Sequence, residues 1–208
     1  MYTLNRQLLV SDALISCLCA LRIGRQPVAQ TQSMTIEEFE VIDEPGRFDL
    51  IRGELVCLPP TGGRHGELAT ELARHVANYV AAHGLGKVYI NETGFVLAEE
   101  PPVVLAPDLA FVRSDRLPPR EDRVGFLRLP PDLAVEIVTP SDRMTQVGAN
   151  VDEYLNAGAP LVWVIELQRR RATVHRPGQS PLVLSEGDAF DGLDVLLGFR
   201  LPVGRIFD

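Results

Sequence analysis

Lysine is almost absent from this chain. The 208 residues include 20 basic side chains and 28 acidic ones, and Lys87 is the single lysine, every other basic side chain being arginine. The net charge of -8 excludes a protein that holds nucleic acid through a broad basic surface. It leaves room for a local basic patch around an acidic, metal-binding centre. The apolar fraction of 46% excludes a mostly disordered chain.

Cysteine and long apolar runs are also scarce. The chain has three cysteines, Cys17, Cys19 and Cys57. An odd number gives no disulfide framework and favours a reducing, cytoplasmic location. The apolar stretch at residues 8–23 is similar to a secretory signal, but Asp12 interrupts it and it is too short for a membrane span. We therefore expect no membrane partner, an N-terminal arm or extension at residues 1–33, and one folded domain at residues 34–208.

The hydrophobic pattern predicts helices and strands in alternation. Apolar residues at helical spacing predict a helix over 65–83 that ends before Gly84, and a second over 141–157 that ends before Gly158. A capping pattern indicates a short helix over 36–42. Apolar runs predict strands at 48–51, 54–58, 87–90, 94–97, 103–112, 133–138, 161–165 and 171–175. This order indicates an α/β fold with a mixed sheet flanked by helices.

Two carboxylates interrupt strongly apolar strands. Asp108 lies in the run 103–112, and Glu136 lies in the run 133–138. Because a buried, unpaired carboxylate is costly, each needs either a metal ion or an arginine partner, and arginines are plentiful. Two carboxylates on neighbouring strands, together with the Ile137 carbonyl, would form the all-oxygen site that Mg²⁺ prefers. Residue chemistry alone leaves both alternatives open.

Several short motifs follow one another in a fixed order. They are Pro107-Asp108, the segments 136–142, 151–158 and 161–165, and in the N-terminal half the segments 48–54, 64–66 and 93–95. Together they resemble the Uma-type putative restriction endonuclease family, part of the PD-(D/E)xK nuclease superfamily, over about residues 34–177. The resemblance implies a restriction-endonuclease-like core and divalent-metal-dependent hydrolysis of phosphodiester bonds in DNA.

The resemblance also implies roles for individual residues. Asp108 and Glu136 would hold Mg²⁺ or Mn²⁺ with the Ile137 carbonyl, and the ion would activate water and polarise the scissile phosphate. Glu54 and His65 match recurring positions of the family. Glu54 would bind the metal directly or through water, and His65 would contact phosphate. The competing interpretations are a solvated strand glutamate and an ordinary histidine at a helix N-terminus.

The chain departs from the family at the position of its catalytic lysine. The family carries that lysine on the helix at 141–157, where this chain has Asn150; the wider superfamily carries it two residues after the glutamate, where this chain has Val138. Asparagine can hydrogen-bond a water molecule but supplies no charge, and Gln146, one turn earlier, has the same limitation. Losing such a stabiliser costs about 2.7–4 kcal/mol. Arg143 and Lys87 are the alternative sources of positive charge.

The expected function is therefore a metal-dependent DNA endonuclease, weakened at Asn150, with a catalytic set of Asp108, Glu136, Asn150, Glu54 and His65. We expect a homodimer, because cutting both strands of a duplex favours two active sites. The alternative is a catalytically inactive nuclease fold that acts as a binding or assembly module. Arginines in the loop 113–131 would either grip phosphates or neutralise the acids of the same loop.

Overall fold

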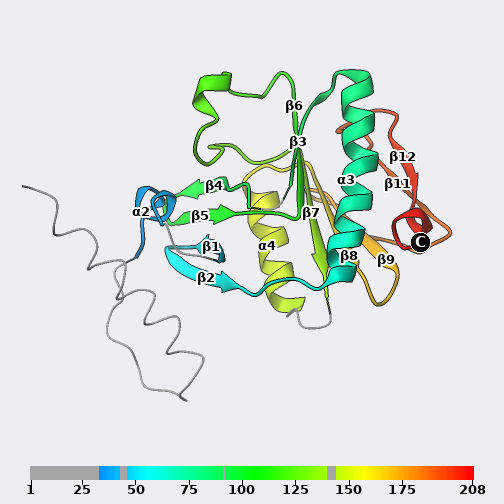
Figure 1. The fold of residues 1–208 in the computed structure, drawn as a ribbon, viewed down its shortest axis with the longest axis horizontal. Coiled ribbons are helices and arrows are strands. Elements are labelled where there is room, and N and C mark those ends of the chain that lie inside the picture. Colours follow the sequence, from blue (N-terminus) through cyan, green and yellow to red (C-terminus); the bar gives the residue numbers. More distant parts are fainter. Residues whose placement is uncertain (1–32, 43–45, 91, 140–143) are drawn as a thin grey trace, which may run out of the picture.

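A six-stranded mixed sheet is the centre of the computed structural model, which describes residues 33–42, 46–90, 92–139 and 144–208 (Figure 1). The strand order is β10-β9-β8-β7-β6-β3, in which β7 and β8 run parallel and the other neighbours run antiparallel. The bounds are β3 Gly86–Ile90, β6 Leu109–Arg113, β7 Leu133–Val138, β8 Leu161–Glu166, β9 Arg171–His175 and β10 Leu182–Leu184. The predicted α/β fold with a mixed sheet is confirmed.

A second sheet of four strands lies beside the first, in the order β2-β1-β5-β4. Its strands are β1 Arg47–Ile51, β2 Glu54–Leu58, β4 Phe95–Glu99 and β5 Pro102–Leu105. The predicted hairpin is confirmed, and its two turn residues, Arg52 and Gly53, have φ values of 53° and 82°. Positive φ at both positions gives the backbone twist that a two-residue hairpin turn requires.

The run at 103–112 was predicted as one strand, and this prediction is wrong. The chain forms β5 up to Leu105 and β6 from Leu109, and these strands belong to different sheets. Pro107 lies between them, and proline has no N–H to donate to a sheet ladder. Asp108 therefore lies where the chain crosses from one sheet to the other rather than in the middle of a strand.

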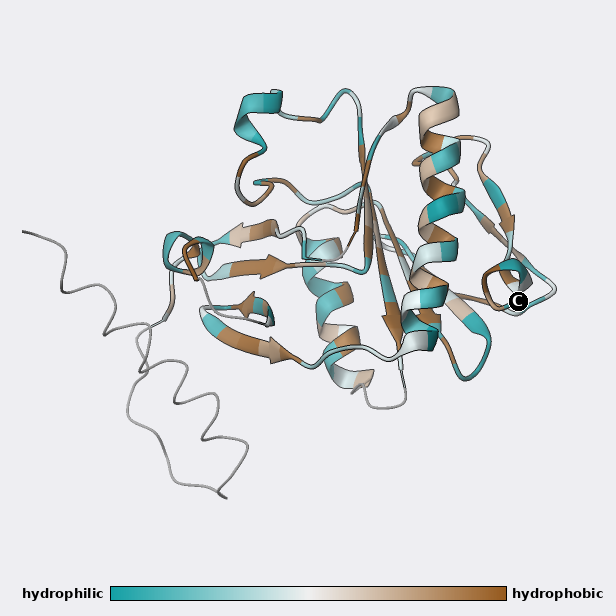
Figure 2. Ribbon diagram, in the orientation of Figure 1, coloured by the Kyte–Doolittle hydropathy of each residue, from teal (hydrophilic) through white to brown (hydrophobic). Residues whose placement is uncertain are grey.

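Helices cover both faces of the large sheet. Helix α3 (Gly63–His83) packs Leu72 and Val76 against alternate residues of β6, β7 and β8. The C-terminal elements β11 (Ala189–Asp191), β12 (Arg200–Pro202) and η2 (Val203–Ile206) contribute to the same cluster. Helix α4 (Met144–Asn156) packs Val151 and Tyr154 on the opposite face. Figure 2 shows the hydrophobic central strands and the alternating hydropathy along α3. The central strands β7 and β8 are thus buried between α3 and α4, and these strands support the site.

The remaining helices agree with their sequence signals. Helix α2 (Ile36–Glu40) begins with the predicted capping box between Thr35 and Glu38. Gly84 ends α3 in the left-handed conformation, with φ of 63°. A 3-10 turn, η1 (Arg120–Asp122), lies in the long arginine-containing loop. The predicted start of the second long helix at 141–143 and residues 1–32 of the predicted arm at 1–33 lie outside the described residues.

No helix in the described ranges is long and apolar enough to cross a membrane. The apolar stretch at 8–23 falls on residues that the structure does not describe, and the predicted domain boundary between residues 33 and 34 stays a prediction.

Trp163 on β8 offers a test of this packing. Its ring is fully buried, 4.7 Å from the Phe190 ring and 6.1 Å from the Phe199 ring. We expect Trp163→Ala to lower the free energy of unfolding by about 3–5 kcal/mol, because it leaves a large cavity. Urea unfolding followed by circular dichroism measures this, with the exposed Val124→Ala as control. A loss within about 1 kcal/mol would contradict the packing.

Candidate active site

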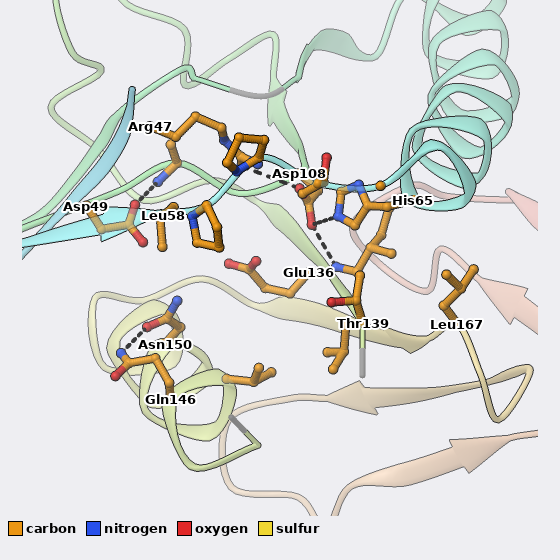
Figure 3. Close-up of a pocket in the computed structure, with 18 of the residues that line it drawn as sticks. Arg47, Asp49, Leu58, His65, Asp108, Glu136, Thr139, Gln146, Asn150 and Leu167 are labelled. Atoms are coloured by element: carbon orange, nitrogen blue, oxygen red, sulfur yellow. Dashed lines mark hydrogen bonds and ion pairs between the residues drawn. The ribbon is translucent and has the colours of Figure 1, made fainter. Parts of the chain in front are cut away.

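Three carboxylates, from both sheets and from the crossing between them, line one cavity. The cavity has a volume of about 420 Å³ and lies between the β1–β2 hairpin, the start of α3, β7 and α4 (Figure 3). Asp49 comes from β1, Asp108 from the crossing before β6, and Glu136 from β7. The fold thus brings together residues that are 59 positions apart (49 to 108) and 28 positions apart (108 to 136) in the sequence. Such a concentration of acids in a partly enclosed space marks a candidate functional site.

Asp108 is held rigidly by three partners. Its Oδ2 accepts a hydrogen bond from the Ile137 N–H at 2.8 Å and lies 3.2 Å from His65 Nε2. Its Oδ1 lies 3.6 Å from Arg47 Nη2. Asp108 and His65 are both buried. His65, in the first turn of α3, therefore contacts the carboxylate, and its ring fixes the orientation of Asp108.

The Ile137 carbonyl faces the same side as Asp108. The next residue, Val138, accepts a hydrogen bond from the Leu167 N–H at 3.2 Å, so its backbone groups point toward β8. Backbone groups alternate along a strand, and those of Ile137 therefore point the other way. Continuing the β6–β7 register from Leu109↔Val135 places Pro107 opposite Ile137. Pro107 has no N–H to offer this carbonyl.

Glu136 lies on the α4 face of β7. Its Oε1 accepts a hydrogen bond from the Tyr154 hydroxyl at 3.0 Å. Burial raises the pKa of Glu136 well above its usual range, and the charges of Asp108 and Asp49 raise it further. The carboxylates thus repel one another in a place that water screens poorly.

Asp49 is the site residue that sequence reasoning missed. It is buried, and its Oδ1 accepts a hydrogen bond from the Ala106 N–H at 3.2 Å. Burial raises the pKa of Asp49 to about 6, and the charge of Asp108 adds to the shift. The signal was available, because Asp49 interrupts an apolar run of the sequence between Phe48 and Leu50, as Asp108 and Glu136 interrupt theirs.

Glu54 does not join the other carboxylates. It stands opposite Ile51 in the hairpin, two residues further toward the turn than the pair Asp49↔Val56. Cross-strand partners share a face, so Glu54 lies on the same face as Asp49. It is nevertheless exposed and is not among the residues that line the cavity. The expectation that Glu54 faces the cleft is therefore not met, and Asp49 occupies that place.

Helix α4 brings amides, not charge, to the cavity. Asn150 and Gln146 both line it, and Gln146 Nε2 donates a hydrogen bond to Asn150 Oδ1 at 3.0 Å. Asp108, Glu136, Ile137 and His65 line the same cavity, and the predicted roles of these residues and of Asn150 stay predictions.

Lys87 is too far away to replace the missing charge. Strand β3 pairs with β6 as expected, but the register sets Lys87 opposite Val112. That is four residues from Asp108, or about 13 Å along the strand. Lys87 is exposed and does not line the cavity. Arg143 lies outside the described residues.

The loop arginines mostly neutralise nearby acids. Arg116 pairs with Asp132 at 2.7 Å, Arg113 with Asp115 at 2.7 Å, and Arg128 with Glu99 at 3.0 Å. Only the pair Arg113–Asp115 joins two residues of the loop 113–131, and the acids of the other two pairs lie outside it, so neutralisation within the loop holds for Arg113.

Comparisons with known proteins agree with this arrangement. A family model, Uma2, described as "Putative restriction endonuclease", matches residues 36–204. The crystal structure of a putative nuclease belonging to DUF820 from Anabaena variabilis is similar, with a TM-score of 0.74 and 21% sequence identity. The match covers 84% of this chain and 97% of that one, so the two share a fold. No curated protein matches.

Proposed function

Because the chain belongs to the Uma2 putative restriction endonuclease family, we propose that it is a metal-dependent DNA endonuclease that hydrolyses phosphodiester bonds in the cavity described above. One observation carries the proposal: Asp49, Asp108 and Glu136 converge from three separate chain segments on one cavity. A fold that gathers three mutually repelling carboxylates, two of them buried, incurs a stability cost, and a site for a cation explains why it is tolerated.

The donor set fits a hard divalent cation. Carboxylate oxygens of Asp108 and Glu136, the Ile137 carbonyl and, close by, Asp49 are all oxygen donors of the kind that Mg²⁺ and Mn²⁺ bind. Among the described residues, no three His, Cys, Asp or Glu side chains form a ready-made metal cluster. Mg²⁺ commonly uses only one or two carboxylates and keeps several waters, so the two facts are compatible.

The protein's own side chains prepare the site around that cation. When bound, the ion would supply Lewis acidity and an activated water. His65 and the Ile137 N–H hold Asp108 in one orientation. The Tyr154 hydroxyl holds Glu136 from the side of α4. The paired amides of Gln146 and Asn150 offer hydrogen bonds to water in the same cavity.

Cleavage assays test the proposal directly. Purified protein is incubated with supercoiled plasmid and with linear duplex DNA in Mg²⁺, Mn²⁺, Ca²⁺ or EDTA. We expect cleavage in Mg²⁺ or Mn²⁺ and none in EDTA. Direct conversion of plasmid to the linear form would support a homodimer. Protein that binds Mn²⁺ yet cleaves neither substrate would refute the proposed activity.

A second candidate function rests on the amide pair of α4. Without a charge at Asn150, the fold could serve as an inactive binding or assembly module. We expect Asn150→Lys to raise kcat less than roughly tenfold, because Arg47 also lines the cavity, 3.6 Å from Asp108, and already brings positive charge there. If neither the wild-type protein nor Asn150→Lys cleaves DNA, the result would support the inactive binding or assembly module. Asn156→Lys, on the exposed end of the same helix, is the matched control.

A further inference from the structure

We propose that Arg47 is a catalytic residue. Its guanidinium contacts the scissile phosphate and provides the positive charge that no side chain of α4 provides. The inference rests on the proposed function and assigns a residue within that site. A phosphoryl group gains charge on its non-bridging oxygens during transfer, and cations aimed at those oxygens are the main source of acceleration.

The position of Arg47 follows from the hairpin. Arg47 and Asp49 are two residues apart on β1, so both side chains project from the same face. Both line the cavity, and the Arg47 side chain is only 20% exposed. Figure 3 shows Arg47 extending over Asp49 toward Asp108.

The Arg47 guanidinium keeps donors available for a phosphate. Its one ion pair within the described ranges joins Nη2 to Asp108 Oδ1 at 3.6 Å, which is too long for a hydrogen bond. A guanidinium has several N–H donors in a planar fork that matches two phosphate oxygens at once. Arg47 is thus held near the carboxylates by charge, and its guanidinium donates no hydrogen bond to another residue that the structure describes.

Other basic side chains near the cavity are less suited. Arg64 lines it but is exposed. Arg52, on the same hairpin, pairs with Glu153 at 3.0 Å and is 67% exposed. His65 is buried against Asp108. Within the described part of the chain, Arg47 is therefore the largely buried arginine that faces the three acids.

Arginine at this position limits the chemistry in a specific way. It stabilises charge well but donates protons poorly. In the proposed hydrolysis, the oxygen of water forms the new P–O bond and one ester P–O bond breaks. The attacking water releases its proton to solvent, and the departing alkoxide takes a proton from water, not from Arg47.

A purely structural role for Arg47 predicts a different outcome. As a counter-ion for Asp108 and Asp49, it would govern stability and cation affinity and leave the chemical step unchanged. As a phosphate ligand, it would govern kcat and one phosphate contact. The two roles can therefore be separated by measuring kcat, Mn²⁺ affinity and the salt dependence of DNA binding on the same variants.

The test compares Arg47→Gln and Arg47→Lys with the control Arg52→Gln. We expect Arg47→Gln to lower kcat by about 10²- to 10³-fold with little change in Mn²⁺ affinity by calorimetry. Arg47→Lys should recover to within roughly tenfold of wild type, since charge is kept and the fork is lost. Guanidinium ion added to the assay should partly restore the kcat of Arg47→Gln and should not raise the kcat of Arg47→Lys or Arg52→Gln. In Ca²⁺, Arg47→Gln should reduce the slope of log affinity for duplex DNA against log salt by about 1.

Two results would overturn the assignment. One is Arg47→Gln with wild-type kcat and an unchanged salt slope. The other is a loss of kcat that tracks an equal loss of Mn²⁺ affinity, which would show a counter-ion. Failure of the proposed function is distinct, because there the wild-type protein itself does not cleave, and the salt slope still decides whether Arg47 contacts phosphate. Arg47→Lys serves if Arg47→Gln does not fold.

Discussion

Replacing Asp108 with asparagine is expected to lower kcat for DNA cleavage by at least about 10³-fold, because it removes a charged oxygen from the proposed cation site. Asparagine preserves the shape of the side chain, and its Oδ1 can still accept the Ile137 N–H that Asp108 accepts at 2.8 Å. The folded structure should therefore survive while cation affinity falls. Initial rates on plasmid DNA in Mn²⁺ and calorimetric titration of Mn²⁺ measure the two effects.

Glu54→Gln is the matched control for this experiment. Glu54 is an acid on the same hairpin face as Asp49, but it is exposed and lies outside the cavity. Its removal should leave the cleavage rate close to that of wild type. Cleavage that survives undiminished in Asp108→Asn at equal purity would reveal a contaminating nuclease. A loss in Glu54→Gln as large as in Asp108→Asn would contradict the geometry of the site.

Replacing Asp49 with asparagine is expected to stabilise the metal-free protein near neutral pH. Burial raises the pKa of Asp49 from 3.8 to about 6 on folding. Between these values the native state holds a proton that the unfolded chain releases, so stability falls as pH rises. Above about pH 6 the carboxylate is ionised in both states, and its burial lowers the free energy of unfolding by about 3 kcal/mol for a shift of two pKa units. Below about pH 4 the carboxyl is protonated in both states and costs nothing.

Urea unfolding in EDTA across this pH range tests the prediction. Asp49→Asn keeps an oxygen for the Ala106 N–H, which Asp49 now accepts at 3.2 Å. The gain in the free energy of unfolding should reach about 2–3 kcal/mol near pH 7 and vanish near pH 4. Saturating Mn²⁺ should stabilise wild type more than the variant. Glu54→Gln, which removes an exposed acid outside the cavity, is the control. An Asp49→Asn variant that is less stable than wild type at neutral pH would contradict the prediction.

Local signals predicted most of the elements of this fold. The helix at 65–83, the hairpin around Arg52-Gly53 and the strand at 133–138 appear within two residues of their predicted ends. Each depends on periodicity, on a cap or on a turn that neighbouring residues encode. The prediction of one strand over 103–112 failed because both halves of this run are apolar. Hydropathy does not report which sheet a strand joins.

The site shows the same division. Asp108 and Glu136 could be identified as candidates because a carboxylate inside an apolar run is costly wherever the run folds. Glu54 was proposed from the family resemblance and Asp49 was not considered. Both are acids on one hairpin, and only the way that hairpin is set against β7 and α4 decides which of them lines the cavity. Sequence spacing does not carry that information.

The scarcity of lysine is a property of the sequence alone, and so is the absence of a lysine at positions 138 and 150. The tertiary structure decided what that scarcity means. The register of β3 against β6 keeps Lys87 about 13 Å from Asp108. The β1–β2 hairpin brings Arg47 to within 3.6 Å of the same carboxylate. Solvent and salt screen the interaction between charges over short distances. The distances in the folded protein therefore decide which cationic side chain can act at the site.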